Sequence, residues 1–240
     1  MLVALRRVIV RFTNWAGGAD LMVLLMLFVL AASVWAFLQL VGTVREGETQ
    51  RLDERILLCL RDPADPSVPI GPAWAGEVGR DLTAVGGVAF LCLITGSVAG
   101  FFLLCRKYHA LVLLLATILG GLLITLLLKG AITRPRPSVV PHLSHVGTTS
   151  FPSGHSLLSV VVYLTLGSIL ARMVQARRLK LYFLAVALLL SLLVGLSRVY
   201  LGVHYPSDVL ASWAAGLGWA VLCWLLARYL QCSHAVEKPL

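Results

Sequence analysis

The feature of this sequence that most constrains its fold is a set of six long stretches without a charged residue. These charge-free runs cover residues 21–44, 82–105, 108–128, 155–171, 181–197 and 209–227. An α-helix needs about 20 apolar residues to cross the hydrocarbon core of a bilayer, so each run is about as long as one crossing. The runs do not alternate polar and apolar residues, which favours helices over a transmembrane β-barrel.

We therefore predict an all-α, polytopic membrane protein with six transmembrane helices, in which residues 1–240 form a single integral membrane domain. The predicted spans are 21–44, 82–105, 108–128, 155–171, 181–200 and 208–227. Only 13% of the residues are charged, about half the share of a soluble domain. That composition excludes a secreted disulfide scaffold, a disordered chain and an ordinary cytosolic enzyme. The five cysteines follow no regular spacing and are expected to be free thiols.

The distribution of basic residues predicts how the protein is oriented. A net charge of +9 would suggest nucleic acid in a soluble protein, but in a membrane protein basic loops mark the cytoplasmic side, so we expect no nucleic-acid partner. With alternating crossings, one side carries 11 Lys and Arg against two acidic residues, and the other carries nine of each. Both termini are therefore predicted to be cytoplasmic, with the other face periplasmic or extracellular in a bacterial inner membrane.

The long connection at residues 45–81 has its own helical pattern. Apolar residues recur at helical spacing in two sets separated by the proline-rich stretch 62–72. The sets are Leu52, Ile56, Cys59 and Leu60, and Trp74, Val78, Leu82 and Val85. We expect two short amphipathic helices on the outer membrane surface, with a plain surface loop as the alternative.

Polar residues of chemical interest gather at the ends of four predicted spans, all on the outer side. They are Lys129, Arg134, Arg136, Ser153, Gly154, His155, Arg198, His204 and Asp208. Taken singly, Lys129 and Arg198 could extend to the headgroups, Ser153 could cap a helix, and Asp208 could offset a helix dipole. Those explanations do not predict two histidines, a carboxylate and several cations at one end of a bundle.

Such a cluster suits phosphoryl transfer. Fixed cations neutralise a phosphate and the charge of its transition state, and backbone N–H groups at a helix start also bind anions. His204 followed four residues later by Asp208 can be a nucleophile oriented by a carboxylate, which leaves His155 to protonate the leaving group. His142 and His145 could be proposed as metal ligands but lack companions. We therefore expect neither a metal nor another cofactor.

Three motifs in order resemble the signature of the type 2 phosphatidic acid phosphatase family. They are Lys129-x6-Arg136-Pro137, Pro152-Ser153-Gly154-His155 and Ser197-Arg198-x5-His204-x3-Asp208. The family includes bacterial undecaprenyl pyrophosphate and phosphatidylglycerophosphate phosphatases and, on a soluble fold, vanadium haloperoxidases. The resemblance implies that Lys129, Arg136, Ser153, Gly154 and Arg198 bind phosphate. It also implies a phosphohistidine at His204, an acid at His155 and an orienting role for Asp208, with Arg134 a supporting cation outside the strict spacing.

The expected function is metal-independent hydrolysis of a lipid phosphate or lipid pyrophosphate on the outer face of the membrane. Undecaprenyl diphosphate, phosphatidate and phosphatidylglycerophosphate are all compatible substrates, and the expected partners are this substrate and membrane lipids. Transfer of the phosphate to another lipid is an alternative with the same residues. An anion transporter is the alternative from another class, although transport sites are expected near the bilayer midplane. The sequence favours no particular lipid and no particular oligomeric state.

Overall fold

The regular structure of this protein is helical. The computed structural model describes residues 21–144 and 147–232. Within these ranges the elements are α2 (Leu21–Arg45), α3 (Gln50–Cys59), α4 (Ala75–Val85), α5 (Val88–Leu104), α6 (Tyr108–Ala131), α7 (Gly154–Met173), α8 (Arg177–Tyr200) and α9 (Pro206–Cys232). An isolated β-bridge between Arg61 and Pro69 is the one non-helical pairing in the described ranges. The predicted all-α class is confirmed.

Most of these helices are long and apolar enough to cross a bilayer. Five pass on length and hydropathy alone, namely α2, α6, α7, α8 and α9. The pair α4 and α5 passes as one span bent by 43°. The protein is therefore a polytopic membrane protein with five to six candidate spans.

The second predicted span, at residues 82–105, is wrong as a continuous helix, because α4 ends before Gly86 and α5 starts after Gly87. Each glycine weakens a helix by about 1 kcal/mol relative to alanine. Gly86 also packs directly on α8, where an added Cβ would lie 2.3 Å from Val194 Cγ1. The Tyr163 hydroxyl of α7 donates to the Val85 carbonyl oxygen at the end of α4. The break is thus built into the packing of α4 and α5 against α7 and α8.

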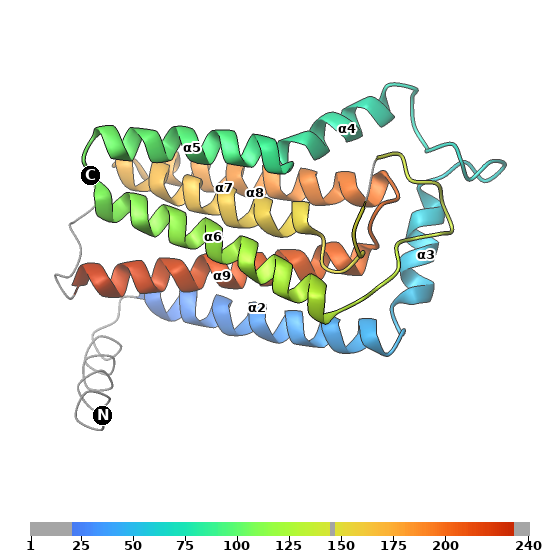
Figure 1. Cartoon of the computed structure of the whole chain (residues 1–240), viewed down its shortest axis with the longest axis horizontal. Helices are drawn as coiled ribbons and strands as arrows, with labels where there is room; N and C mark the ends of the chain where they lie inside the picture. Colours follow the sequence, from blue (N-terminus) through green and yellow to red (C-terminus); the bar gives the residue numbers. More distant parts are fainter. Residues whose placement is uncertain (1–20, 145–146, 233–240) are drawn as a thin grey trace.

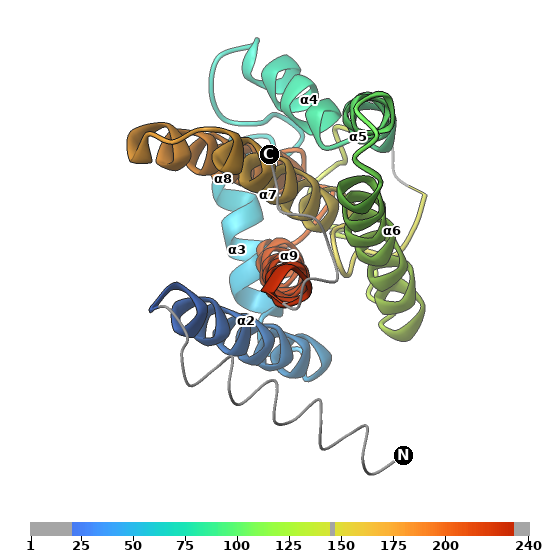
Figure 2. The same cartoon turned by 90° about the vertical axis from the view of Figure 1, so that its left-hand side faces the viewer.

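The long helices run side by side, and α9 lies in the middle of the bundle (Figures 1 and 2). Figure 2 shows α9 between α2 on one side and α6, α7 and α8 on the others. Two tryptophans of α9 fit against glycines of its neighbours, Trp213 on Gly195 of α8 and Trp219 on Gly120 of α6. The missing Cβ atoms leave room for the indole rings, so the helices approach closely.

The segment between α2 and α5 contains helices α3 and α4 where the two amphipathic patterns lie, so the loop alternative does not describe it. Its inward face is partly polar. Leu52 is 62% exposed whereas Asp53 is only 2% exposed. Arg61 is buried as well, and burial lowers the pKa of its guanidinium, which donates to the carbonyl oxygens of Leu60 and Tyr200. The segment therefore packs against the end of the bundle. Cys59, Cys92, Cys105 and Cys223 are free thiols.

Candidate active site

One end of the bundle carries the residues that the sequence singled out. Helices α6 and α8 end there and α7 and α9 begin there, beside α3 (right-hand side of Figure 1). The structure places at this end Lys129, Arg134, Arg136, Ser153, Gly154, His155, Arg198, His204 and Asp208. His155 is close enough to interact electrostatically with Arg198, His204, Lys129 and Arg136. The four helix ends therefore form one cluster.

The start of α7 has a hydrogen-bonded cap. Ser153 is its N-cap, and the Ser153 Oγ accepts from the backbone N–H of Ser156 at 3.5 Å and from the Ser156 hydroxyl at 2.8 Å. The capping alternative thus describes the side chain of Ser153. The first N–H groups of a helix have no acceptor within the helix, so those of Gly154 and His155 can donate to an anion.

Asp208 is fully buried and holds several donors in fixed positions. Its Oδ1 accepts from Arg134 Nη1 at 2.6 Å. Its Oδ2 accepts from the Tyr205 backbone N–H at 3.0 Å and from the Ser150 hydroxyl. The Nδ1 of His204 lies 3.7 Å from the same Oδ2, slightly beyond hydrogen-bonding distance. Asp208 therefore faces the ring of His204 while other groups keep the carboxylate in place.

His204 is 2% exposed and lies in the short turn between α8 and α9. Burial lowers the pKa of its imidazole to about 4, and repulsion by Arg136 and Arg198 adds to this effect, against the attraction of Asp208. The ring is therefore neutral at neutral pH. Its Nε2 lies 3.4 Å from Arg136 Nη1. Nδ1 has no hydrogen-bond partner among the described residues, and the Asp208 carboxylate lies 3.7 Å from it.

Three cations at this site lack a carboxylate partner among the described residues: Lys129, Arg136 and Arg198. Lys129 donates to Thr148 Oγ1 and to the Thr149 carbonyl oxygen, at 3.2 and 3.0 Å. Arg136 donates to the carbonyl oxygens of Thr148 and Val203, at 2.7 and 2.6 Å.

The third cation is also the most deeply buried. Arg198 is 3% exposed and donates to Thr83 Oγ1 of α4 at 3.4 Å, while its Nε has no partner among the described residues. Burial lowers the pKa of Arg136, and the charge of Asp208 only partly offsets this. Desolvated cations without counter-ions are unfavourable on their own, so this arrangement favours a bound anion with more than one negative charge.

Arg134 is arranged differently from these three. Burial alone would lower its pKa, but the carboxylates of Asp208 and Asp53 outweigh burial and raise it. Its guanidinium donates to Asp208 on one side and to Asp53 Oδ2, at 2.9 Å, on the other, and it stacks 4.0 Å from the centre of the Tyr205 ring. Arg134 thus bridges two buried carboxylates and is already neutralised.

Sequence reasoning missed the polar residues behind Asp208. Asp53 of α3 accepts from the Ser207 backbone N–H at 3.0 Å and from the Ser207 hydroxyl, and Ser150 donates to Asp208. Ser207 adjoins Asp208 and could have been noticed for that reason. Asp53 follows no spacing that links it to residue 134 or 207, so its only signal was an acidic residue in an amphipathic helix.

The histidines considered as metal ligands do not form a metal site in the described residues. His142 Nε2 lies 2.7 Å from the Pro137 carbonyl oxygen, and His145 lies outside the described residues. Within residues 21–144 and 147–232, no three His, Cys, Asp or Glu side chains are grouped so that they could hold a metal ion.

Comparison with known proteins identifies the family. Residues 109–232 match the PAP2 superfamily. The chain is 34% identical to phosphatidylglycerophosphatase B of Bacillus subtilis over 184 residues, 75% of this chain and 86% of that protein. It is also 34% identical to a lipid A 1-phosphatase of Rhizobium etli over 193 residues, 69% of this chain and 78% of that protein.

The fold agrees with the sequence comparison. The crystal structure of a transmembrane PAP2-type phosphatidylglycerolphosphate phosphatase from Bacillus subtilis matches with a TM-score of 0.72 and 28% identity. The match covers 88% of this chain and 98% of that structure. The family predicted from the three motifs is confirmed, and the chain belongs to the PAP2 superfamily.

Proposed function

We propose that the protein hydrolyses a lipid phosphate or lipid pyrophosphate, without a metal ion, through a phosphohistidine at His204. Membership of the PAP2 superfamily and relatives named as lipid phosphatases support this class of reaction. The observation that carries the proposal is the trio Lys129, Arg136 and Arg198, which lacks carboxylate partners in the described residues. Arg136 and Arg198 lie near the neutral imidazole of His204, and all three cations lie near His155. That combination suits a dianionic phosphate next to a nucleophile.

In the first step the phosphoryl group moves to the enzyme. The three cations and the N–H groups at the start of α7 hold the phosphate oxygens, and Nε2 of His204 attacks phosphorus. Arg136 is 3.4 Å from this atom, so an oxygen bound to Arg136 is already next to the nucleophile. A phosphorus–nitrogen bond forms, the bond to the lipid oxygen breaks, and His155 gives its proton to that oxygen. Asp208 stabilises the charge that develops on the ring.

In the second step water regenerates the enzyme. His155, now without its proton, takes one from a water molecule whose oxygen attacks phosphorus, and the phosphorus–nitrogen bond breaks. Inorganic phosphate leaves and both histidines return to their starting states. If a lipid hydroxyl reached the site in place of water, the same step would be phosphate transfer to that lipid.

The location follows from the charge pattern of the chain. The end with the candidate site carries balanced charges, whereas the opposite loops are basic, as cytoplasmic loops are. The substrate is therefore a lipid phosphate of the outer leaflet of a bacterial inner membrane, such as phosphatidylglycerophosphate, phosphatidate or undecaprenyl diphosphate.

The test is to trap the intermediate. Purified protein in detergent is mixed with lipid labelled in its terminal phosphate and quenched within the first turnover. We expect label on His204, stable to base and labile to acid, together with phosphate release without any gradient. His204→Ala should give neither. Arg80→Gln, which changes an exposed arginine paired with Glu77, should leave both unchanged. Label on another residue, or consumption of the lipid only in the presence of a divalent metal, would contradict the mechanism.

A further inference from the structure

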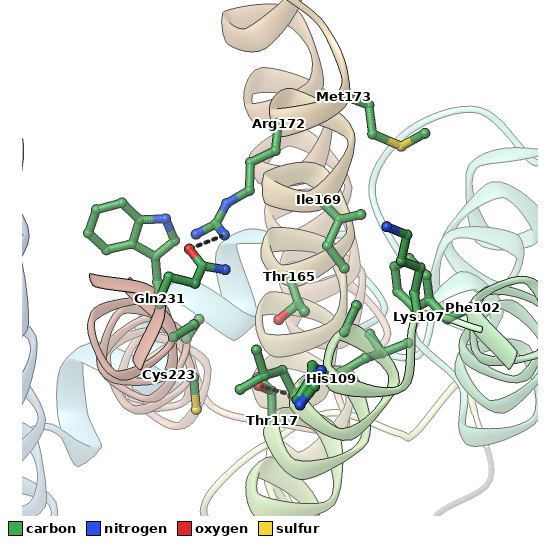
Figure 3. Close-up of a pocket in the computed structure, with 16 residues that line it drawn as sticks. Phe102, Lys107, His109, Thr117, Thr165, Ile169, Arg172, Met173, Cys223 and Gln231 are labelled. Atoms are coloured by element: carbon green, nitrogen blue, oxygen red, sulfur yellow. Dashed lines mark hydrogen bonds between the residues drawn. The ribbon is translucent and has the colours of Figure 1, made fainter. Parts of the chain in front are cut away.

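A cavity lies at the end of the bundle opposite the candidate active site. It has a volume of about 140 Å³ and opens between α6, α7 and α9, with Phe102 of α5 at its side. Figure 3 shows the side chains around it. The candidate site involves the last turn of α6 and the first turn of α7, whereas this cavity involves the first half of α6 and the last turns of α7.

The deep part of this cavity is apolar. Leu113, Leu114, Ile169 and Ala220 contribute hydrocarbon surface. Two threonines also line it, but both hydroxyls bond to their own helices. Thr117 donates to the Leu113 carbonyl oxygen at 2.7 Å, and Thr165 donates to that of Val161 at 2.6 Å. The deep walls therefore suit an alkyl chain.

The outer part is basic. Arg172 in the last turn of α7 donates to Gln231 Oε1 of α9 at 3.4 Å, and Lys107 stands at the start of α6. Figure 3 shows Arg172 and Gln231 on one side of the cavity and Lys107 on the other. A group held between Arg172 and Lys107 would have two cations on opposite sides and the apolar part of the cavity beneath it.

The charge of this whole end has one sign in the described residues. Of the 11 acidic residues in the sequence, Asp20 and Glu237 lie outside the described ranges, and the remaining nine lie toward the other end. Seven basic residues lie at this end: Arg106, Lys107, Arg172, Arg177, Arg178, Lys180 and Arg228. Basic pockets between transmembrane helices bind acidic lipid headgroups.

We propose that this cavity binds one acidic phospholipid from the leaflet opposite the candidate active site. The headgroup phosphate lies between Lys107 and Arg172, and one acyl chain lies between α6, α7 and α9. From Arg172 to Thr165 the wall is about 10 Å deep at a rise of roughly 1.5 Å per residue, a large part of one leaflet's hydrocarbon. A zwitterionic lipid would bring its own cation near two others, so a net negative headgroup is favoured.

The test is lipid retention measured by native mass spectrometry. The full-length protein is reconstituted in phosphatidylcholine with a minority of phosphatidylglycerol, extracted in mild detergent, and its bound lipids are counted. Wild type should keep one phosphatidylglycerol. Lys107→Gln with Arg172→Gln should weaken retention by about 25-fold, from roughly fivefold per basic residue. Arg106→Gln with Lys180→Gln removes the same charge from the same end without touching the cavity and should retain the lipid.

A second variant tests the apolar part. Ala220→Leu fills the deep wall and leaves both cations in place, so it should also lose the lipid. Equal losses in the cavity pair and the control pair would mean nonspecific attraction to the basic end and would overturn the proposal. The proposal would also be overturned if the protein retained phosphatidylcholine as well as it retains phosphatidylglycerol. The same holds if inorganic phosphate displaced the bound lipid as strongly as added phosphatidylglycerol does. Turnover of the soluble substrate p-nitrophenyl phosphate in lipid-free detergent, measured for every variant, reports the fold independently of this cavity.

Discussion

The burial of Asp53 could not be expected from the residues beside it in the sequence. Asp53 lies in a helix with exposed apolar residues, yet its carboxylate is buried and receives Arg134 and both donors of Ser207. Arg134 in turn donates to Asp208, which faces His204. Asp53 is therefore a positioning residue, since it reaches the nucleophile only through Arg134, Ser207 and Asp208.

The Asp53→Asn variant tests this positioning role. The amide keeps the shape but loses the charge and one acceptor, so we expect a loss of about 1.5–3 kcal/mol in unfolding free energy, the usual worth of a hydrogen bond to a charged group. First-turnover phosphorylation should slow by roughly tenfold with little change in KM, since the phosphate ligands are intact. Glu48→Gln, an exposed change in the neighbouring turn, should alter neither quantity. A changed KM with an unchanged first-turnover rate would contradict the role.

The lowered pKa of His204 predicts the acid limb of the reaction. Phosphorylation needs the neutral ring, so its rate should fall as the pH drops through about 4, not through the ordinary histidine value near 6.5. Asp208 raises this pKa, so Asp208→Asn should move the limb to lower pH as well as slow the reaction. First-turnover rates of both proteins are measured with the same substrate and compared as a ratio at each pH. The titration of the substrate phosphate near pH 6 affects both rates equally and drops out of this ratio. A limb that moves upward in Asp208→Asn would show that another group titrates.

His155 makes a prediction about leaving groups. A lipid alkoxide needs a proton as its bond to phosphorus breaks, whereas p-nitrophenolate leaves without one. His155→Ala should slow the first turnover of a lipid monophosphate by about 10²–10⁴ and that of p-nitrophenyl phosphate much less. Steady-state rates would mix this step with the hydrolysis of the phosphohistidine, so burst kinetics are required. Equal losses with both substrates would mean that His155 binds phosphate or holds the start of α7, and that the acid is another group.

For individual residues, the sequence predicts that the three motifs come together at one end of the bundle. It does not predict every residue that hydrogen-bonds to them. The three motifs lie at helix ends that alternate in direction, so their convergence follows from topology alone. The contacts of Asp53 with Arg134 and Ser207 join positions 81 and 154 residues apart, and no periodicity records them. The sequence makes Arg134 a supporting cation, and only its two buried carboxylate partners distinguish it from the three cations that lack one.

Among the helices, α4 and α5 show that hydropathy alone does not predict where a helix breaks. Charge-free length predicted one helix across residues 82–105, because a window of hydropathy does not register the packing of Gly86 on Val194. The amphipathic patterns did predict both α3 and α4, since their spacing is set by the helix itself. They could not predict that Asp53 and Arg61 face inward, because the partners of these residues come from α9, the end of α8 and the segment after α6.

Substitutions at the glycines of this region should separate packing from helix propensity. Gly86→Ala places a Cβ against Val194 and should destabilise the protein by about 1–3 kcal/mol, the usual range for an overpacked core. Gly96→Ala in α5 meets nothing within 4 Å and should be neutral or slightly stabilising. Thermal unfolding in detergent compares the two. The double variant Gly86→Ala with Val194→Ala should recover part of the loss, and no recovery would locate the strain elsewhere.

At the scale of the whole molecule, the charge difference between the two ends predicts the topology. In a cysteine-free background, single cysteines placed at Pro141 and Ala64 should react with a membrane-impermeant thiol reagent in intact cells. The outer membrane, where there is one, must be permeable to the reagent. A cysteine at Ala176, in the loop before α8, should react only after the cells are opened. The opposite pattern would place the candidate site in the cytoplasm.

The buried chain from Asp53 through Arg134 to Asp208 has a consequence for engineering. The family match begins at residue 109, yet the carboxylate that holds Arg134 lies 56 residues earlier in the chain. A chimera that took its catalytic half from this protein and its first half from another would bring Arg134 without Asp53. Unless the donor of the first half supplied a carboxylate at the same place, the guanidinium would keep Asp208 as its one carboxylate partner among the residues described here. Recombination boundaries should therefore fall before α3, so that helices α3 to α9 are inherited as one unit.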